Sequence, residues 1–293
     1  MKRFGAQNMV SPLKKVLMKK PQPFMSKVNL QKWNYIGPLD QNLIDTSYNE
    51  FYQIIKNAET EILELKLEDE NEELCDSVFT HDPSLILNEG AIILNMSKKL
   101  RKKETQAHKK FYNSLGIPII GCIVNEGTIE GGDCLWINDS TLLIGEGYRS
   151  NREGIEQLQA ILKLLNIRLI PIPLPKNKIN EGSCFHLMSI ISMLDHDLAI
   201  GCKSLLPDDL RAILKNNGIQ LIAMPEDEFF KSKTLGVNIL ALSPRNLVTI
   251  EGCTKTLDLL SHSGCTLNLF NGNEFCIRAE GGPTCLTRAI WRN

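Results

Sequence analysis

The sequence predicts an α/β fold, a five-bladed α/β propeller built from pseudo-symmetric ββαβ units. Three observations predict it: hairpin patterns recur about every fifty residues, a helical pattern and a short apolar strand follow each hairpin, and the chain ends supply the parts of one more unit. A repeat of that length is typical of propeller-like architectures. The alternative is a doubly wound α/β protein with two domains.

The hairpin pattern is an apolar run, a polar tip and a second apolar run. It is clearest at 135–144, where Leu135 and Ile137 alternate with other residues before a tip at Asn138-Asp139-Ser140, and Gly145 closes the second run. The same pattern predicts hairpins at 85–94, 193–200 and 239–250.

A helix and a strand are expected after each hairpin. Amphipathic periodicity predicts helices at 103–115, 152–165, 207–216 and 254–263. Residues suited to end a helix follow them, at Gly116, Asn166, Gly218 and Gly264. Short apolar runs predict the closing strands at 117–120, 168–171, 220–223 and 266–269.

Both ends of the chain are expected to share the fifth unit. Residues 274–278 and 15–18 would form its hairpin, 43–56 its helix and 62–67 its last strand. This arrangement closes the ring and leaves no unpaired end, so the sequence predicts one domain over residues 1–293.

Composition excludes several classes of protein. The 293 residues are 43% hydrophobic and 23% charged, which suits a chain with a sizeable core. A formal net charge of −1 gives no reason to expect a nucleic-acid partner. An apolar run long enough for a membrane span is missing, and so is the apolar region of a signal peptide, so we expect no membrane partner. The nine cysteines are scattered without a C-x-x-C pair, which favours a reducing, cytoplasmic location over a disulfide framework or a zinc site.

One stretch concentrates residues suited to chemistry. Gly131 and Gly132 stand between Glu130 and Asp133, and Arg149 follows the next hairpin. Glycines allow the backbone to approach a ligand closely. Carboxylates followed by an arginine suit a ligand with a cationic end and an anionic end.

The segments that lead into the five hairpins should converge near the pseudo-fivefold axis. We call them the lead-in segments, and they are residues 77–83, 127–133, 182–189, 235–242 and 278–287. Four of them carry an ionisable or nucleophilic side chain, namely Asp82, Glu130, His186 and Cys285. Equivalent positions in a repeat predict a common site. Cys285 follows a Gly-rich loop that can leave its sulfur accessible, and it would need a nearby cation to become a thiolate.

These motifs resemble those of the guanidino-group-modifying enzymes, which comprise arginine deiminases, dimethylargininases and amidinotransferases. The resemblance spans roughly residues 5–290 and rests on Glu130-Gly131-Gly132-Asp133, Arg149-Ser150-Asn151, Phe185-His186-Leu187 and Gly281-Gly282-Pro283-Thr284-Cys285. It implies the five-bladed propeller called the pentein fold.

The resemblance also implies roles for the site residues. Cys285 would be the nucleophile, His186 the general acid and base, and Glu130 the acid that completes the set. Asp82 would grip the guanidinium, and Arg149 and Arg101 would bind a substrate carboxylate. Asp133 is expected to brace its loop, and His81 to line the pocket. Such a reaction needs no cofactor and no metal.

The residue two positions after His186 departs from the deiminase pattern. Deiminases carry His-x-Asp there, whereas this chain carries the uncharged Met188. Dimethylargininases also lack that second aspartate, although they do not typically carry methionine there, and a substrate outside both families stays open. The resemblance therefore favours hydrolysis of an Nω-methylated arginine to citrulline and a methylamine. Arginine deiminase, amidinotransferase and a catalytically silent binding module stay open as alternatives. The partner is a small guanidino compound, and a homodimer is one option that the sequence does not decide.

Overall fold

A computed structural model describes residues 4–67, 73–175 and 184–293 of the chain. Within these residues it contains five sheets of three strands each. In every sheet two strands pair antiparallel and the third pairs parallel with the middle one. The predicted five-bladed α/β propeller of ββαβ units, the pentein fold, is confirmed.

In each sheet one edge strand lies next to the axis and is called the inner strand; the middle strand and the outer strand follow. The inner strands are β3 (Ser84–Ile86), β6 (Cys134–Asn138), β9 (Ile191–Asp195), β12 (Leu240–Ser243) and β15 (Arg288–Arg292). The middle strands are β4 (Ala91–Ile93), β7 (Thr141–Glu146), β10 (Leu198–Gly201), β13 (Asn246–Ile250) and β1 (Leu13–Met18). The outer strands are β5 (Ile119–Cys122), β8 (Arg168–Pro173), β11 (Gln220–Ala223), β14 (Thr266–Phe270) and β2 (Glu61–Glu64).

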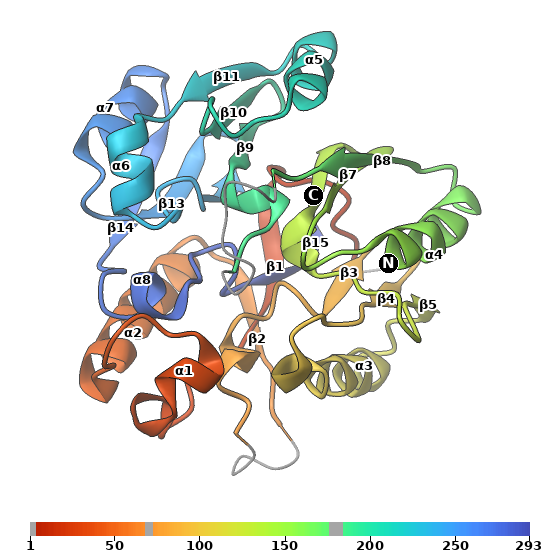
Figure 1. Cartoon of the computed structure of the whole chain (residues 1–293), viewed down its shortest axis with the longest axis horizontal. Helices are drawn as coiled ribbons and strands as arrows, with labels where there is room; N and C mark the ends of the chain where they lie inside the picture. Colours follow the sequence, from red (N-terminus) through yellow and green to blue (C-terminus); the bar gives the residue numbers. More distant parts are fainter. Residues whose placement is uncertain (1–3, 68–72, 176–183) are drawn as a thin grey trace.

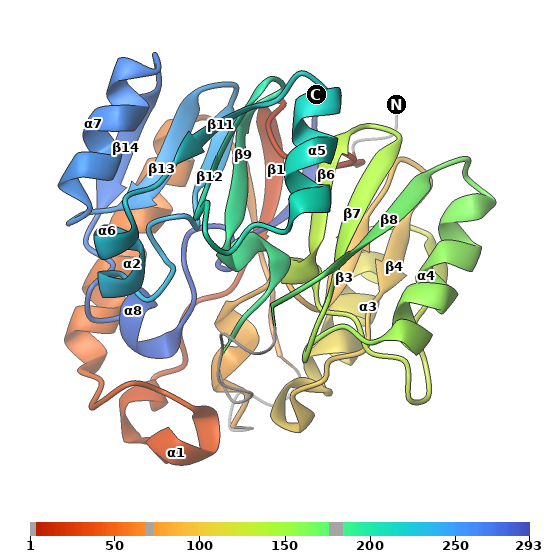
Figure 2. The same cartoon turned by 45° about the horizontal axis from the view of Figure 1, so that its top comes forward.

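A helix joins the middle strand of each unit to its outer strand and lies on the outside of the ring (Figures 1 and 2). These helices are α3 (Glu104–Ser114), α4 (Arg152–Lys163), α5 (Asp208–Asn216), α7 (Thr254–His262) and α2 (Gln41–Asn57). Three short helices lie in the connections, α1 (Leu30–Trp33), α6 (Glu226–Lys231) and α8 (Cys276–Ala279).

Helix α4 shows why these segments are helical. The Asn151 side chain accepts a hydrogen bond from Gly154 N and so caps the first turn. Ile155, Leu158 and Leu162 recur at helical spacing and are buried against the sheet. The helix ends before Asn166, which has a positive φ of 57° and turns the chain into β8.

The fifth unit differs from the sequence prediction in one strand. Residues 274–278 do not form a strand, because Cys276–Ala279 is the short helix α8. The strand that pairs antiparallel with β1 is β15, with Val16 opposite Ala289. It follows the lead-in segment 278–287, as the inner strand does in every other unit. Its apolar pattern is hidden in the sequence because its ends are arginines, and both are buried.

Residues 5–12 cross the end of the axis that carries the hairpin tips. Gly5 N donates to Ile290 O, and Ala6 N donates to Ile86 O. Gln7 contacts two tips, because its Oε1 accepts from Asn88 N and its Nε2 donates to Asp139 O. This segment therefore covers that end of the axis.

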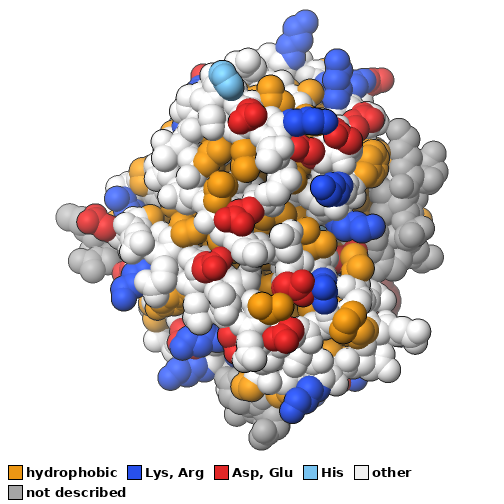
Figure 3. Space-filling model, turned by 90° about the vertical axis from the view of Figure 1, so that its left-hand side faces the viewer, with side chains coloured by type: hydrophobic (Ala, Val, Ile, Leu, Met, Phe, Trp, Pro, Cys, Tyr) orange, Lys and Arg blue, Asp and Glu red, His pale blue; other side chains and the backbone are white. Residues whose placement is uncertain are grey.

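The surface over α6 and α7 is mixed in character. Figure 3 shows acidic and basic side chains interspersed among apolar ones on this face. Phe230 and Leu259 are exposed there, and scattered apolar side chains are common on protein surfaces. Among the described helices, none combines the length and the apolar character that a membrane crossing requires.

Candidate active site

The lead-in segments converge at the end of the axis opposite the hairpin tips. Two adjoining pockets lie there, and Cys184, Glu280 and Cys285 line both of them. The first pocket is also lined by Asp82, Arg101 and Arg149. The second is also lined by His81, His186, Met188 and Asn238. The structure thus brings together all the site residues expected from the sequence, with Glu130 buried behind them.

His186 and Glu130 form a hydrogen-bonded pair. His186 Nε2 lies 2.9 Å from Glu130 Oε2, and both side chains are buried. His186 directly precedes a 3-10 turn, and its backbone N donates to Ser189 Oγ at 3.0 Å. The turn fixes the ring, and the carboxylate favours a proton on Nε2.

Glu130 is held as an anion by several donors. Its Oε1 accepts from Ser97 N at 3.0 Å and Lys98 N at 3.4 Å, and Arg149 Nη1 lies 3.4 Å from Oε2. Burial alone would raise the pKa of Glu130, but Arg149 and His186 lower it to about 2. A fixed negative charge therefore lies next to the imidazole at neutral pH.

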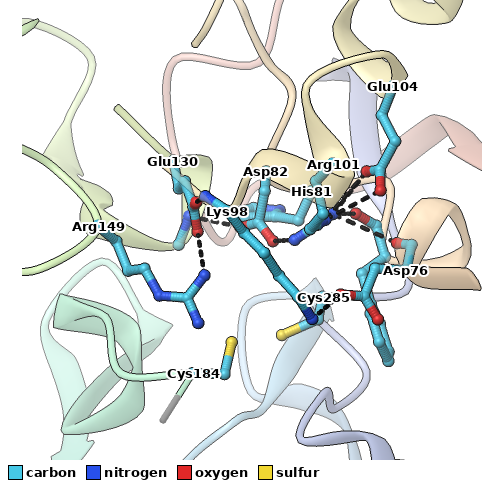
Figure 4. A network of polar contacts seen from close by, with 12 residues as sticks. Asp76, His81, Asp82, Lys98, Arg101, Glu104, Glu130, Arg149, Cys184 and Cys285 are labelled. Carbon is cyan, nitrogen blue, oxygen red and sulfur yellow. Dashed lines mark hydrogen bonds and ion pairs between the residues drawn. The ribbon is translucent and has the colours of Figure 1, made fainter. Parts of the chain in front are cut away.

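Asp82 is the second fixed anion of the site (Figure 4). Arg101 Nη1 donates to its Oδ2 at 2.6 Å, and Gly132 N donates to its Oδ1 at 3.0 Å. Burial opposes ionisation, but Arg101 holds the pKa of Asp82 well below its usual range. The carboxylate is thus ionised and fixed at the edge of the first pocket.

Arg101 is engaged by protein carboxylates. Its Nε donates to both oxygens of Glu104 at 3.1 Å, and its Nη2 donates to Glu104 Oε2 at 2.9 Å. Nη2 also donates to Phe79 O at 2.9 Å. Binding of a substrate carboxylate by Arg101 stays a prediction. Its contacts favour a different role, which is to orient Asp82.

Asp133 joins two lead-in segments. Its Oδ2 accepts from Ser150 Oγ at 2.6 Å, and its Oδ1 accepts from Leu187 N at 2.9 Å. The adjacent Gly132 packs against the imidazole so closely that a Cβ atom would lie 2.8 Å from the Cγ of His186. These contacts are those of a bracing residue, and they fix the loop against the turn that carries His186.

Cys285 is half-buried where the two pockets meet. Asn238 Nδ2 donates to its Sγ at 3.1 Å, and Asn238 Oδ1 accepts from Thr284 N at 2.9 Å. A Cβ at Gly282 would lie 2.7 Å from the Cγ of Asn238, so the glycine permits this approach. The amide therefore holds the loop and the sulfur together.

The pKa values of the Cys285 thiol and the His186 imidazole are both raised. Burial, followed by Asp82 and Cys184, raises the pKa of Cys285 to about 12. Burial alone would lower the pKa of His186, but Cys184, Asp133 and Glu130 raise it well above its usual value. Without a ligand at neutral pH the site therefore holds a thiol and an imidazolium. A cation next to Cys285 would favour the thiolate.

Two side chains that the sequence did not predict contact this pair. Asn238 belongs to the one lead-in segment in which no ionisable residue was found, and its position in the repeat was the available signal. Cys184 lies two residues before His186, and its Sγ is 3.8 Å from His186 Nδ1. Figure 4 shows Arg149, Cys184 and Cys285 pointing toward the same space.

A further polar group borders the far side of the first pocket. Lys98 Nζ donates to Asp76 Oδ2 at 2.6 Å and to Trp33 O at 2.7 Å, and it lies 5.1 Å from the centre of the Trp33 ring. Tyr35 Oη donates to Asp76 Oδ1 at 2.8 Å. Local sequence gave no signal for this group, because its members come from three distant segments.

The described ranges contain no group of three or more His, Cys, Asp and Glu side chains that could hold a metal ion. His81 lines the second pocket, as expected. Its Nδ1 lies 3.0 Å from Thr287 O, which is an acceptor, so Nδ1 carries the proton.

Comparison with known proteins gives one family and several relatives. A family model described as Arginine deiminase matches residues 70–209 and 201–292. The chain is 26% identical over 280 residues to the N(G),N(G)-dimethylarginine dimethylaminohydrolase of Streptomyces coelicolor. That match covers 94% of this chain and 96% of the relative.

Two solved structures show the same fold. A mutant of the dimethylarginine dimethylaminohydrolase from Pseudomonas aeruginosa, complexed with citrulline, has a TM-score of 0.77 at 20% identity and covers 94% of this chain and 98% of that one. An amidinotransferase from Microseira wollei in the saxitoxin biosynthetic pathway has a TM-score of 0.80 at 15% identity, with coverages of 99% and 97%. At these identities the likeness concerns the fold.

Proposed function

The chain belongs to the arginine deiminase family, and from this premise we propose that it is a cysteine-dependent hydrolase of a guanidino compound. The family model and a relative named as a dimethylaminohydrolase support this proposal. The observation that carries the proposal is the buried His186–Glu130 pair, 2.9 Å between Nε2 and Oε2, at the same pocket as Cys285.

Substrate binding creates the nucleophile. A guanidinium between Asp82 and Cys285 brings a positive charge to a thiol whose pKa is raised to about 12, so it favours loss of the thiol proton to solvent. Asp82 is ionised, lines the first pocket and orients the planar cation through charge-assisted hydrogen bonds. The ionised Glu130 is buried behind the pocket and acts through His186.

The reaction then needs one group that gives and later takes a proton. Cys285 Sγ bonds to the guanidinium carbon, His186 donates its proton to the departing amine, and the C–N bond breaks to leave a covalent thiouronium. The neutral imidazole next removes a proton from water, which attacks the same carbon. The C–S bond breaks as the added hydroxyl loses its proton to the departing sulfur, which leaves the ureido product and the Cys285 thiol.

The substrate that we propose is an Nω-methylated arginine, which would give citrulline and a methylamine. Met188 supports it, because this residue is 4% exposed and lines the second pocket together with Leu235. An apolar, adaptable side chain accommodates methyl groups, whereas a second carboxylate would favour an unsubstituted guanidinium. Arg149 is the proposed receptor for the substrate carboxylate, because it lines the first pocket beside Cys285.

The test compares kcat/KM for Nω,Nω-dimethylarginine and arginine in three forms of the protein. The wild type should prefer the methylated substrate. Met188→Asp should shift the ratio toward arginine, by roughly ten- to more than a hundredfold for one charge-assisted hydrogen bond. The control Met188→Leu keeps an apolar side chain and should keep the preference.

A wild-type preference for arginine would overturn the proposed substrate and favour the deiminase alternative. Transfer of the amidino group to an added amine, in place of hydrolysis, would favour an amidinotransferase. Binding of guanidino compounds without turnover would favour the alternative of a catalytically silent binding module. One domain over residues 1–293, a cytoplasmic location and a homodimer stay predictions.

A further inference from the structure

A cavity lies on the propeller axis behind the active site. Its volume is about 20 Å³, room for a single small ion or water molecule, and it is lined by inner strands of several units and by residues of the segment 5–12. His81 and Thr284 line both this cavity and the second pocket of the active site, so they form the wall between the two. Arg288 and Arg292 also line the cavity, and we call it the axial cavity.

Arg292 places a buried cation in the axial cavity. The residue is 8% exposed, its Nη1 donates to Ser11 O at 2.6 Å, and its Nη2 donates to Ala241 O at 2.9 Å. Both acceptors are neutral carbonyl groups. Burial lowers the pKa of Arg292 to about 9, and among the described residues no charged group raises this pKa again. In the part of the chain that the structure describes, no carboxylate forms an ion pair with this guanidinium.

Arg288 is a second buried cation on the same strand. It is 6% exposed, and its Nη2 donates to His81 O. Its Nε is buried without a hydrogen-bond partner among the described residues. Asp82 acts on it electrostatically, but the Asp82 oxygens accept from Arg101 and Gly132. Burial still lowers the pKa of Arg288.

Two further polar residues line this cavity. His81 donates through Nδ1 to Thr287 O, and its Nε2 is buried with no partner in the described ranges. Asn8 uses its Oδ1 to accept from Val10 N and Ser11 N, so its Nδ2 is the end left to donate. The cavity therefore combines two buried guanidinium groups with polar groups that can bond to a ligand.

We propose that the axial cavity binds one small monovalent inorganic anion, of the size of chloride, against Arg288 and Arg292. A buried charge is costly unless a counter-ion and hydrogen bonds compensate it, and guanidinium N–H groups suit an anion. Among the described residues no carboxylate forms an ion pair with Arg292, whereas Asp82 acts electrostatically on Arg288, so close to one positive charge is left uncompensated. That balance favours a monovalent anion over a dianion. The site is separate from the proposed reaction and does not depend on it.

The anion should bind the folded chain only, because Arg292 and Ala241 come together through the propeller fold. Binding then stabilises the native state by mass action. We expect Tm to rise with chloride at constant ionic strength, with gluconate as the replacing anion. Above Kd the rise should follow the logarithm of the chloride concentration and reach on the order of 5 °C at a hundred times Kd.

Variants of Arg292 test whether the chloride dependence of Tm comes from the axial cavity. Arg292→Met removes the cation and keeps an apolar side chain of similar length, so its Tm should not depend on chloride. The matched control is Arg168→Met on β8, an exposed arginine, which should keep the full dependence. Should Arg292→Met fail to fold, Arg292→Lys replaces it and should bind chloride more weakly, because it cannot keep the fork geometry.

Crystals of the wild-type protein soaked in bromide give the direct test. An anomalous peak in the axial cavity, next to Arg288 and Arg292, is the expected result. The proposal is overturned if bromide is absent from this cavity, or if Tm is unchanged when chloride replaces gluconate. The same crystals soaked in phosphate should show no phosphate there, and its presence would overturn the preference for a monovalent anion.

Discussion

Replacing Glu130 by glutamine tests the proposed acid–base pair most directly. The Glu130 carboxylate accepts hydrogen bonds from three groups: Oε2 from His186 Nε2 at 2.9 Å and Arg149 Nη1 at 3.4 Å, and Oε1 from Ser97 N at 3.0 Å. Glutamine has the same shape, and its oxygen can still accept from Ser97. Its NH₂ group would then meet the donors of His186 and Arg149. Glu130→Gln therefore removes the charge and reverses one hydrogen bond without creating a cavity.

The size of the effect follows from that bond. A hydrogen bond to a charged group contributes about 1.5 to 3 kcal/mol, so its loss from the transition state lowers kcat/KM by roughly ten- to more than a hundredfold. The variant also loses one of the groups that raise the pKa of His186. Because His186 must be protonated to donate to the leaving amine, the alkaline limb of the pH profile should move to lower pH.

The assay is kcat/KM for Nω,Nω-dimethylarginine between pH 5 and 10, on the variant and on the control Glu89→Gln. Glu89 is exposed at the tip between β3 and β4, so its variant should behave like the wild type. A Glu130→Gln protein that kept more than a third of the wild-type kcat/KM, with its alkaline limb in place, would refute the role of the pair.

Stability gives a second measurement on the same variant. The pKa of Glu130 is lowered in the fold from 4.5 to about 2, so the unfolded state binds more protons between these values. Its charged form stabilises the fold above about pH 4.5, and this contribution is lost as pH falls toward 2. Urea unfolding should therefore show a flatter loss of stability over this range in Glu130→Gln than in Glu89→Gln.

Three further predictions concern the nucleophile. Cys285→Ser should abolish turnover and leave Tm nearly unchanged, and a residual kcat above a small fraction of the wild-type value would contradict the covalent route. An amidinium-bearing alkylating agent should inactivate the protein at least tenfold faster at pH 7 than its neutral amide analogue, because only the cation favours the Cys285 thiolate; equal rates would argue that the thiolate exists beforehand. Asn238→Ala should lower kcat several-fold by loosening the loop around Thr284, while Asn246→Ala on β13, away from the site, should not. Mass spectrometry of the quenched wild-type reaction should find the covalent adduct on Cys285.

Four of the five units could be predicted because each is contiguous in the sequence. The hairpin, the helix and the closing strand follow one another there, and the apolar patterns have the right periods. The fifth unit takes strands from both chain ends, so the inner strand had to be identified by its own composition. Arg288 and Arg292 gave β15 the appearance of an exposed segment, since arginine is seldom fully buried. The sequence therefore favours residues 274–278 as the strand, whereas they belong to a loop and the helix α8.

The site residues were found by their position in the repeat more than by their chemical type. Asp82, Glu130, His186 and Cys285 occupy equivalent lead-in segments, and an ionisable side chain drew attention to each. Asn238 occupies the same place in the remaining unit, but an amide does not ionise and so gives no such signal. Equivalence in the repeat is the stronger signal, because it includes Asn238 as well.

The contacts that the sequence could not supply share one physical cause, which is that they cross the axis. His186 bonds to a carboxylate 56 residues away, Asn238 to a sulfur 47 residues away, and Arg292 to a carbonyl 51 residues away. Each spacing is close to the length of one repeat, because the inner ends of neighbouring units meet at the axis. A local pattern can show that a polar residue points inward, but its partner belongs to another unit. The same geometry explains why catalytic candidates and uncompensated arginines lie on one line through the molecule: the axis is where polar side chains of different units can be buried together.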